Sequence, residues 1–151
     1  MRISAKADYA VRAAVELAAA GGEPVKGEKL AEAQDIPLQF LEHILLELKH
    51  ARLVRARRGA KGGYWLARAP EEITLANIIR AVEGPLANIQ DLAPESTEYP
   101  GHAKHLTDVW IAVRVSLRRV LEQITIADLT EGRIPEPVGE LIKDPGAWDT
   151  R

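Results

Sequence analysis

Residues 49–68 read KHARLVRARRGAKGGYWLAR, and this stretch decides how the rest of the chain is interpreted. It contains seven lysine or arginine side chains and no acidic one, although the formal net charge of the whole chain is -2. Two short strands are expected, at 53–57 and 64–68, because apolar and aromatic residues flank a glycine-rich turn. A basic hairpin in an acidic protein concentrates positive charge in one place, so we expect it to bind a polyanion.

The net charge changes sign between the two halves of the chain. Residues 1–70 hold 12 basic and 8 acidic side chains, a net of +4, whereas residues 71–151 hold 8 basic and 14 acidic ones, a net of -6. The first half is therefore predicted to contact phosphate, and the second half to serve another purpose.

The segment before the hairpin has the apolar periodicity of three helices, at about 4–20, 27–34 and 38–50, with Ser4 as the N-cap of the first. In the third helix, apolar residues recur at i, i+3, i+4 and i+7 and are expected to be buried: Leu41, Ile44, Leu45 and Leu48. Two close helices followed by a basic hairpin is the order of a winged helix-turn-helix DNA-binding domain, which we place at 1–84. The expected fold class is mainly α with a small β-hairpin wing.

The second half is predicted to contain a short helix at 74–83, an irregular sensor-type loop at 85–102 and a long helix at about 103–126. Apolar residues of the long helix alternate at spacings of four and three: Leu106, Trp110, Val113, Leu117, Val120 and Ile124. This coiled-coil seam could pack on its own domain, but we prefer pairing with a second copy, because DNA-reading winged helices usually work as dimers. We assign 103–131 to a dimerisation helix and 132–151, with its three Pro and three Gly, to a flexible tail.

Composition excludes several classes of protein. The 151 residues suffice for one domain with an appendage, and the absence of cysteine excludes disulfides, thiolate metal sites and a cysteine nucleophile. No apolar run approaches the roughly 18 residues of a membrane helix, and charges at Lys6, Asp8 and Arg12 interrupt any signal peptide. No set of Ser, His and Asp residues occurs in a sequence context that indicates a catalytic triad. We therefore expect a soluble cytoplasmic protein that is not an enzyme, contacts no membrane and carries no cofactor.

Candidate DNA contacts lie on the third helix and on the hairpin. At the start of the helix, Gln39 can make a paired hydrogen bond with adenine, Glu42 can accept one from cytosine, and His43 can donate or accept. Arg58, at the tip of the hairpin, could enter the minor groove and read its width. The alternative is an ordinary solvated surface. The complete candidate set is Leu38, Gln39, Phe40, Glu42, His43, Arg57, Arg58, Gly59, Lys61, Gly62, Gly63 and Tyr64.

Several segments together resemble the Rrf-two family of bacterial transcription regulators, the group that includes the IscR, NsrR and CymR types. The matching segments are 2–6, 9–12, 30–32, 36–42, 53–54, 58–68 and 73–84, with 110 and 124–129 similar to the dimerisation helix and its end. The resemblance implies a homodimer with crossing long helices, bound to an inverted repeat with its wings in the minor groove. It also places Gln39, Glu42 and His43 on the base-reading positions, and Arg58 on the minor-groove arginine.

The chain departs from this family in its loop. Many members hold an iron–sulfur cluster through three cysteines before the dimerisation helix, whereas the equivalent loop here, 91–103, contains none, so no conventional cluster is expected. Asp8 sits where some members place a carboxylate ligand, and we interpret it as a first-turn helix charge. His102 and His105 are weak metal candidates, because such a pair beside a helix start is more often surface decoration. A small molecule, a metal or a partner protein acting at 86–105 stays open.

We therefore expect a dimeric, sequence-specific transcription regulator that binds double-stranded DNA at an inverted-repeat operator and represses by excluding polymerase. The alternative is a protein-interaction adaptor whose acidic C-terminal half binds a metabolic enzyme or another regulator. The salt dependence of DNA affinity distinguishes the two hypotheses. A protein that contacts six or more phosphates should lose affinity by roughly 10³ or more between low and moderate salt.

Overall fold

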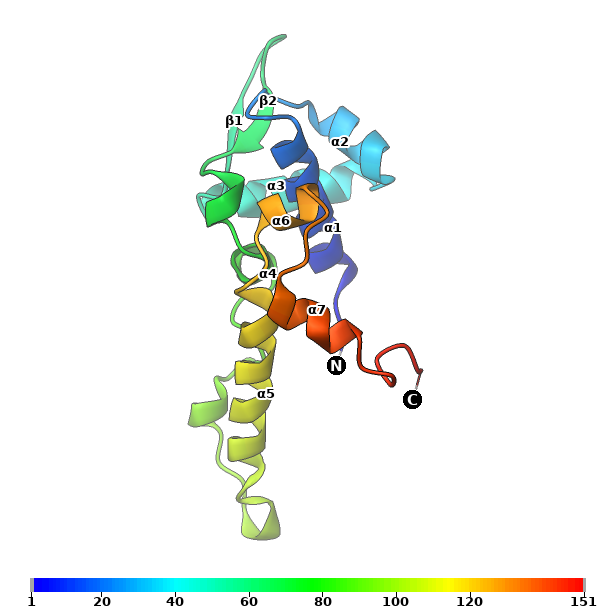
Figure 1. Ribbon diagram of the computed structural model, residues 1–151. Coiled ribbons are helices and arrows are strands. Elements are labelled where there is room, and N and C mark those ends of the chain that lie inside the picture. Colours follow the sequence, from blue (N-terminus) through cyan, green and yellow to red (C-terminus); the bar gives the residue numbers. More distant parts are fainter. Residues whose placement is uncertain (1, 151) are drawn as a thin grey trace.

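The computed structural model describes residues 2–150 and has two parts, a helical body that carries a β-hairpin and a long arm that projects away from it (Figure 1). The arm is one helix, α5 (Leu106–Leu121), together with the loop that leads to it. This architecture confirms the predicted fold class, mainly α with a β-hairpin. Among the described residues, no helix is both long and apolar enough to span a membrane.

The three predicted helices before the hairpin are confirmed as α1 (Ala5–Ala19), α2 (Gly27–Gln34) and α3 (Leu38–His50). The Ser4 hydroxyl accepts a hydrogen bond from the Ala7 N–H at 3.0 Å and so caps α1 as expected. Between α2 and α3, Asp35 adopts a left-handed conformation with φ 50, which turns the chain sharply and sets the angle of α3.

The interior of the body is built around α3. Each apolar residue predicted for its buried face is 0% exposed: Leu41, Ile44, Leu45 and Leu48. Helix α1 packs against this face with small residues, Ala10, Ala13 and Ala14, which let the two helices approach closely. Because the inner face of α3 is filled, its opposite face is held toward solvent, and that face carries the candidate base-reading residues.

The hairpin consists of β1 (Val54–Arg57) and β2 (Gly63–Leu66), which pair antiparallel with Val54 opposite Leu66. Strand β2 is also paired on its other edge. The Val25 N–H donates to the Tyr64 carbonyl at 2.9 Å, and the Tyr64 N–H donates to the Val25 carbonyl at 2.8 Å. The wing is therefore attached to the segment that leads directly into α2.

A 3₁₀ turn, η1 (Pro70–Glu72), leads from the wing to α4 (Leu75–Glu83), and α4 begins beside α6 (Ile126–Thr130). The Leu75 N–H donates to the Ile124 carbonyl at 2.9 Å, and the Ile126 N–H donates to the Ile73 carbonyl at 2.8 Å. Ile126 is fully buried in the same core as α1 and α3. The chain beyond the arm therefore completes the body, which does not close at residue 84.

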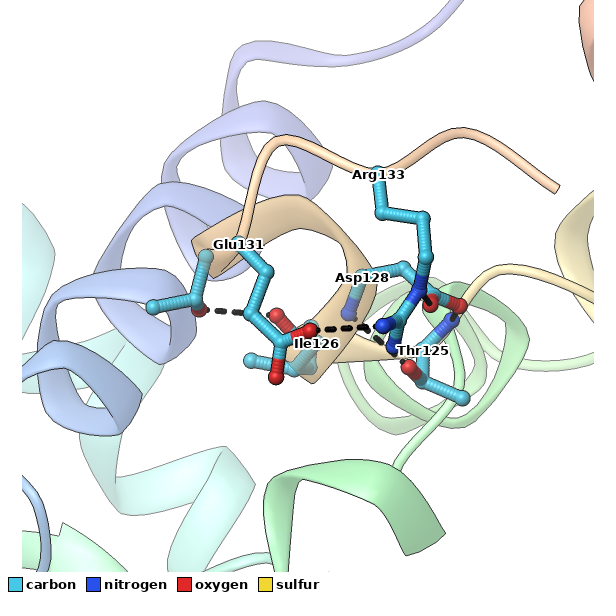
Figure 2. A network of polar contacts seen from close by, with 6 residues as sticks. Thr125, Ile126, Asp128, Glu131 and Arg133 are labelled. Carbon is cyan, nitrogen blue, oxygen red and sulfur yellow. Dashed lines mark hydrogen bonds and ion pairs between the residues drawn. The ribbon is translucent and has the colours of Figure 1, made fainter.

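A polar network fixes the point where the chain returns from the arm (Figure 2). Thr125 and Asp128 form a capping box, each accepting a backbone N–H of the other at 3.0 Å. Arg133 donates to Asp128 at 2.9 Å and pairs with Glu131 at 2.8 Å. The Thr125 N–H, followed by the Arg133 guanidinium, lowers the pKa of the Asp128 carboxyl below its ordinary value. An ionised carboxylate thus stabilises the start of α6.

The expectation of one long helix at 103–126 is wrong. Residues Gly101–Ala103 form a 3₁₀ turn, η3, and α5 ends at Leu121, after which the chain turns back to the body. Ile124, which the spacing placed on the seam, is only 8% exposed and lies in the body, because its carbonyl pairs with Leu75. The segment at 132–151 is not simply a loose tail, since it contains α7 (Glu136–Ile142) with Val138 buried.

The loop before α5 is more ordered than expected and packs along the arm. It contains η2 (Pro94–Ser96), whose Pro94 is buried. The Thr107 hydroxyl donates to the Thr97 carbonyl at 2.8 Å, and Arg114 pairs with Glu95 at 2.7 Å. This loop therefore covers one side of α5, although no residue of the helix is fully buried.

Candidate nucleic-acid interface

The exposed face of α3 presents three polar side chains predicted to read bases. Gln39, Glu42 and His43 are all exposed, because they lie opposite the buried face of the helix. They occur in its first two turns, the part of a recognition helix that enters the major groove. Amide, carboxylate and imidazole groups at these places can donate to or accept from base edges.

Leu38 and Phe40, also in the candidate set, have a different position. Leu38 is half-buried against the core. The Phe40 ring lies edge-on to the Tyr9 ring with centroids 5.6 Å apart, and the Arg12 guanidinium stacks over Tyr9 at 4.7 Å. Both apolar residues therefore orient the start of α3 against its neighbours.

Glu47 of α3 is half-buried and joins α3 to α1. Its carboxylate accepts a hydrogen bond from the Lys6 ammonium at 2.9 Å and lies 3.7 Å from the His43 ring nitrogen Nε2. The i, i+4 spacing of His43 and Glu47 was a signal for this contact in the sequence. Lys6 carried no such signal, because its contact with Glu47 is non-local.

The tip of the wing is a tight turn that depends on glycine. The Gly62 N–H donates to the Gly59 carbonyl at 2.9 Å, and the Arg57 guanidinium donates to the Lys61 carbonyl at 3.1 Å. A Cβ atom on Gly62 would lie 2.0 Å from the Arg57 carbonyl oxygen, so no side chain fits there. The turn leaves Arg58 and Lys61 exposed at the tip, as a minor-groove probe requires.

The base of the wing is equally crowded. Gly63 has φ 143, and a Cβ atom there would lie 2.7 Å from the backbone of Val25. The Tyr64 ring lies 3.6 Å from the position of a Cβ on Gly27, at the start of α2. Gly63 and Tyr64 thus hold the wing against the segment before α2, while the exposed tip residues remain free to face DNA.

A groove of about 470 Å³ separates the wing from α2 and α3. It brings Glu42 of α3 together with Arg57 and Arg58 of the wing. Its complete lining is Lys26, Gly27, Glu28, Glu42, Leu46, Lys49, Ala56, Arg57, Arg58, Gly59, Gly63 and Tyr64. Residues of the recognition helix and of the wing therefore share one basic groove, where phosphate binding and base reading can occur together.

Two lysines of this groove were absent from the candidate set. Lys49 lies in the last turn of α3, within the basic stretch at 49–68, so its charge could have indicated it. Lys26 lies at the start of α2, and nothing in the sequence links it to the wing.

The candidate metal ligands lie elsewhere. His102 and His105 are both exposed, in η3 and at the N-cap of α5, and His105 lies 3.9 Å from Asp108. Among residues 2–150, no group of three or more His, Cys, Asp or Glu side chains is placed to hold a metal ion. Asp8 pairs with Arg12 at 3.1 Å. With no thiolate in the sequence, these donors do not fit an iron–sulfur cluster.

Several known proteins are similar in sequence to this chain over most of its length. An HTH-type transcriptional regulator of Mycobacterium tuberculosis is 52% identical over 99% of this chain and 94% of its own length. The regulator CymR of Bacillus subtilis is 35% identical over 85% of this chain and 89% of its own. IscR of Cereibacter sphaeroides is 34% identical over 89% and 90%.

Solved structures agree with these relatives. The structure of B. subtilis CymR, the global cysteine regulator, superposes with a TM-score of 0.72 at 32% identity, covering 89% of this chain and 99% of that one. T. potens IscR superposes with a TM-score of 0.69 at 32% identity, covering 93% and 96%. The profile of the Rrf2 family, described as "Iron-dependent Transcriptional regulator", matches residues 3–132. The chain therefore belongs to the Rrf2 family of DNA-binding transcriptional regulators and is not an enzyme.

Proposed function

We propose that this Rrf2-family regulator is a homodimeric repressor that binds an inverted-repeat operator in the bacterial cytoplasm without an iron–sulfur cluster. The observation that carries the proposal is the shared groove, in which Glu42 of α3 faces Arg57 and Arg58 of the wing. Each copy would place α3 in a major groove and Arg58 in the neighbouring minor groove. Occupying the operator would then exclude polymerase.

Phosphate and base contacts have separate sources on this surface. Arg57, Lys61 and Lys49 supply positive charge that neutralises phosphates and fixes the register of the protein on DNA. Gln39, Glu42 and His43 supply the hydrogen-bonding groups that distinguish one base pair from another. This division supports sequence-specific binding over a purely electrostatic association.

The arm supports a dimer, because α5 has 16 residues and none of them is buried. One side of it lines an apolar groove of about 780 Å³, which the ends of α1 and α4 complete. The predicted seam residues that line this groove are Leu106, Trp110, Val113 and Leu117. Val109, on another side of the arm, is 51% exposed. These partly exposed apolar side chains need a covering surface, and a second copy offers a matching seam.

Trp110 and Arg114 give further support for a partner at the arm. The indole Nε1 of Trp110 and the Nε of Arg114 are shielded from solvent but have no hydrogen-bond acceptor within the described chain. A shielded donor without an acceptor is costly, so a second copy that brings acceptors would stabilise this region.

The adaptor hypothesis is less favoured, because the relatives are regulators named for DNA-binding motifs. An effector at residues 86–105 remains part of the proposal, since the ordered loop there packs directly on α5. A ligand or partner that moved this loop would act on the dimer.

The test is selection of genomic DNA fragments by the purified protein at near-physiological salt, followed by sequencing of the bound fragments. Enrichment of one inverted repeat supports the proposal, and sedimentation of the complex should give two copies per repeat. The matched control is the double variant Arg58→Glu, Lys61→Glu, which alters only exposed side chains of the wing tip and should enrich nothing. Recovery of the same repeat by that variant, or no enrichment by the natural protein, would contradict the proposal.

A further inference from the structure

Lys26 occupies an unusual place at the start of α2. It is the N-cap residue of the helix, and its side chain makes no capping hydrogen bond. A cation at a helix N-terminus is disfavoured by the helix dipole, and polar side chains such as Ser or Asp are preferred there. Helix stability therefore does not account for a lysine at this position.

The ammonium group of Lys26 forms a hydrogen bond with the wing. It donates a hydrogen bond to the carbonyl of Gly59, in the turn at the wing tip. The same carbonyl accepts the Gly62 N–H at 2.9 Å. Lys26 therefore adds a second donor to the carbonyl that closes the turn, one residue after Arg58.

The contact completes an attachment that begins in the neighbouring residue. Val25 holds the base of the wing through two backbone hydrogen bonds to Tyr64, at 2.9 and 2.8 Å. These bonds fix the start of β2 but do not reach the tip. Lys26 reaches from the same segment to the tip, so the wing is held at two points along its length.

We propose that Lys26 is a positioning residue of the wing, which holds the Gly59 carbonyl so that Arg58 meets DNA from a fixed place. This inference rests on the proposed DNA-binding function. The competing role for a lysine in a basic groove is a direct phosphate contact. The geometry favours positioning, because the ammonium is already engaged by a backbone carbonyl.

The first test uses the free protein and does not depend on DNA. Amide hydrogen exchange is measured for the wing in the natural protein, in Lys26→Met, and in Lys29→Met as the matched control. Lys29 is also an exposed lysine of α2. Lys26→Met should speed exchange of the Gly62 amide about fivefold, the factor that one net hydrogen bond is worth, and Lys29→Met should not. Unchanged exchange in Lys26→Met overturns the proposal.

The second test is a double-mutant cycle with Arg58→Ala on the operator recovered by selection. Lys26→Met alone should weaken binding about fivefold, and it should add little when Arg58 is already absent. Lys26→Arg can still reach the Gly59 carbonyl, so it should restore the affinity for the operator and the preference for the bases that the wing contacts. The thermal stability of the protein should be the same in all variants. Independent losses, with a salt dependence reduced by about 0.9 per copy, would identify a phosphate contact instead.

The two tests separate failure of this inference from failure of the proposed function. Additive losses on an operator that the natural protein binds overturn the role of Lys26 and leave the repressor proposal intact. If the natural protein binds no DNA, both proposals are overturned, even if hydrogen exchange shows that Lys26 holds the Gly59 carbonyl.

Discussion

Replacing Gly62 with alanine should disable the wing while leaving the body folded. The new Cβ would lie 2.0 Å from the Arg57 carbonyl oxygen, so the two backbone segments must separate by about 1.4 Å to reach the 3.4 Å of ordinary contact. The nearest atoms that the new Cβ would meet all belong to the main chain of Arg57 and Arg58, so no flexible side chain can yield. Overpacking of this kind typically costs about 1–3 kcal/mol, and here it is relieved by opening the turn.

The consequence should appear in DNA binding rather than in folding. Opening the turn breaks the Gly62–Gly59 hydrogen bond and displaces Arg58 and Lys61. If both cations are withdrawn from the DNA, the slope of log K against log salt should fall by about 2 per copy. Fluorescence anisotropy on the selected operator measures both affinity and slope. The double variant Arg58→Ala, Lys61→Ala provides the reference, and Gly62→Ala should match it.

A second glycine supplies the control for this experiment. Gly139 lies in α7, and a Cβ there would meet nothing within 4 Å. Gly139→Ala should leave DNA binding unchanged and raise helix stability by less than about 1 kcal/mol. Natural affinity and a natural salt slope in Gly62→Ala would contradict this prediction, because the wing would then tolerate an open turn. A large loss of thermal stability in Gly62→Ala would also refute it, since the turn is remote from the core.

Three further predictions address the arm, the core and the return point. Trp110→Glu places a charge in the apolar groove of α5, so sedimentation should show monomers, whereas the exposed Ser116→Glu should remain dimeric. Leu45→Ala removes a fully buried side chain and should lower the free energy of unfolding by about 2–5 kcal/mol in urea titrations. The Asp128 carboxyl has a lowered pKa in the folded protein, so its stabilisation is present above the unfolded carboxyl pKa of about 3.9 and is lost as pH falls through the folded value. Thermal melts of Asp128→Asn should lack this acid-dependent component.

The body was predictable because local rules decide most of it. The buried face of α3 follows from helical spacing, and Leu41 and Leu48 are accordingly 0% exposed. The wing follows from strand residues around a glycine turn, and Gly62 and Gly63 occupy positions where a side chain would collide with backbone. In both elements, propensity and packing favour the same conformation, so the sequence alone was sufficient.

The end of the arm was predicted wrongly because a non-local contact outweighs the coiled-coil spacing. The alternation of four and three continues to Ile124, but the backbone of that residue pairs with Leu75 and takes the chain back to the body. A signal for this return was present in the sequence. Residues 73–78 read ITLANI and residues 124–129 read ITIADL, and both begin a helix with a threonine capping box.

In the candidate site, the sequence indicates which side chains can contact DNA but not what holds them in place. Charge and hydrogen-bonding capacity indicated Glu42 and Arg58 in the sequence, because those properties belong to single residues. The wing is held against the body in part by Val25, which pairs with Tyr64 across a long separation in the chain. Val25 carries neither a charge nor a hydrogen-bonding side chain, so nothing in its residue type indicates this role. Operator preference should therefore also depend on residues outside the candidate DNA-contact set, since these residues hold the wing in place.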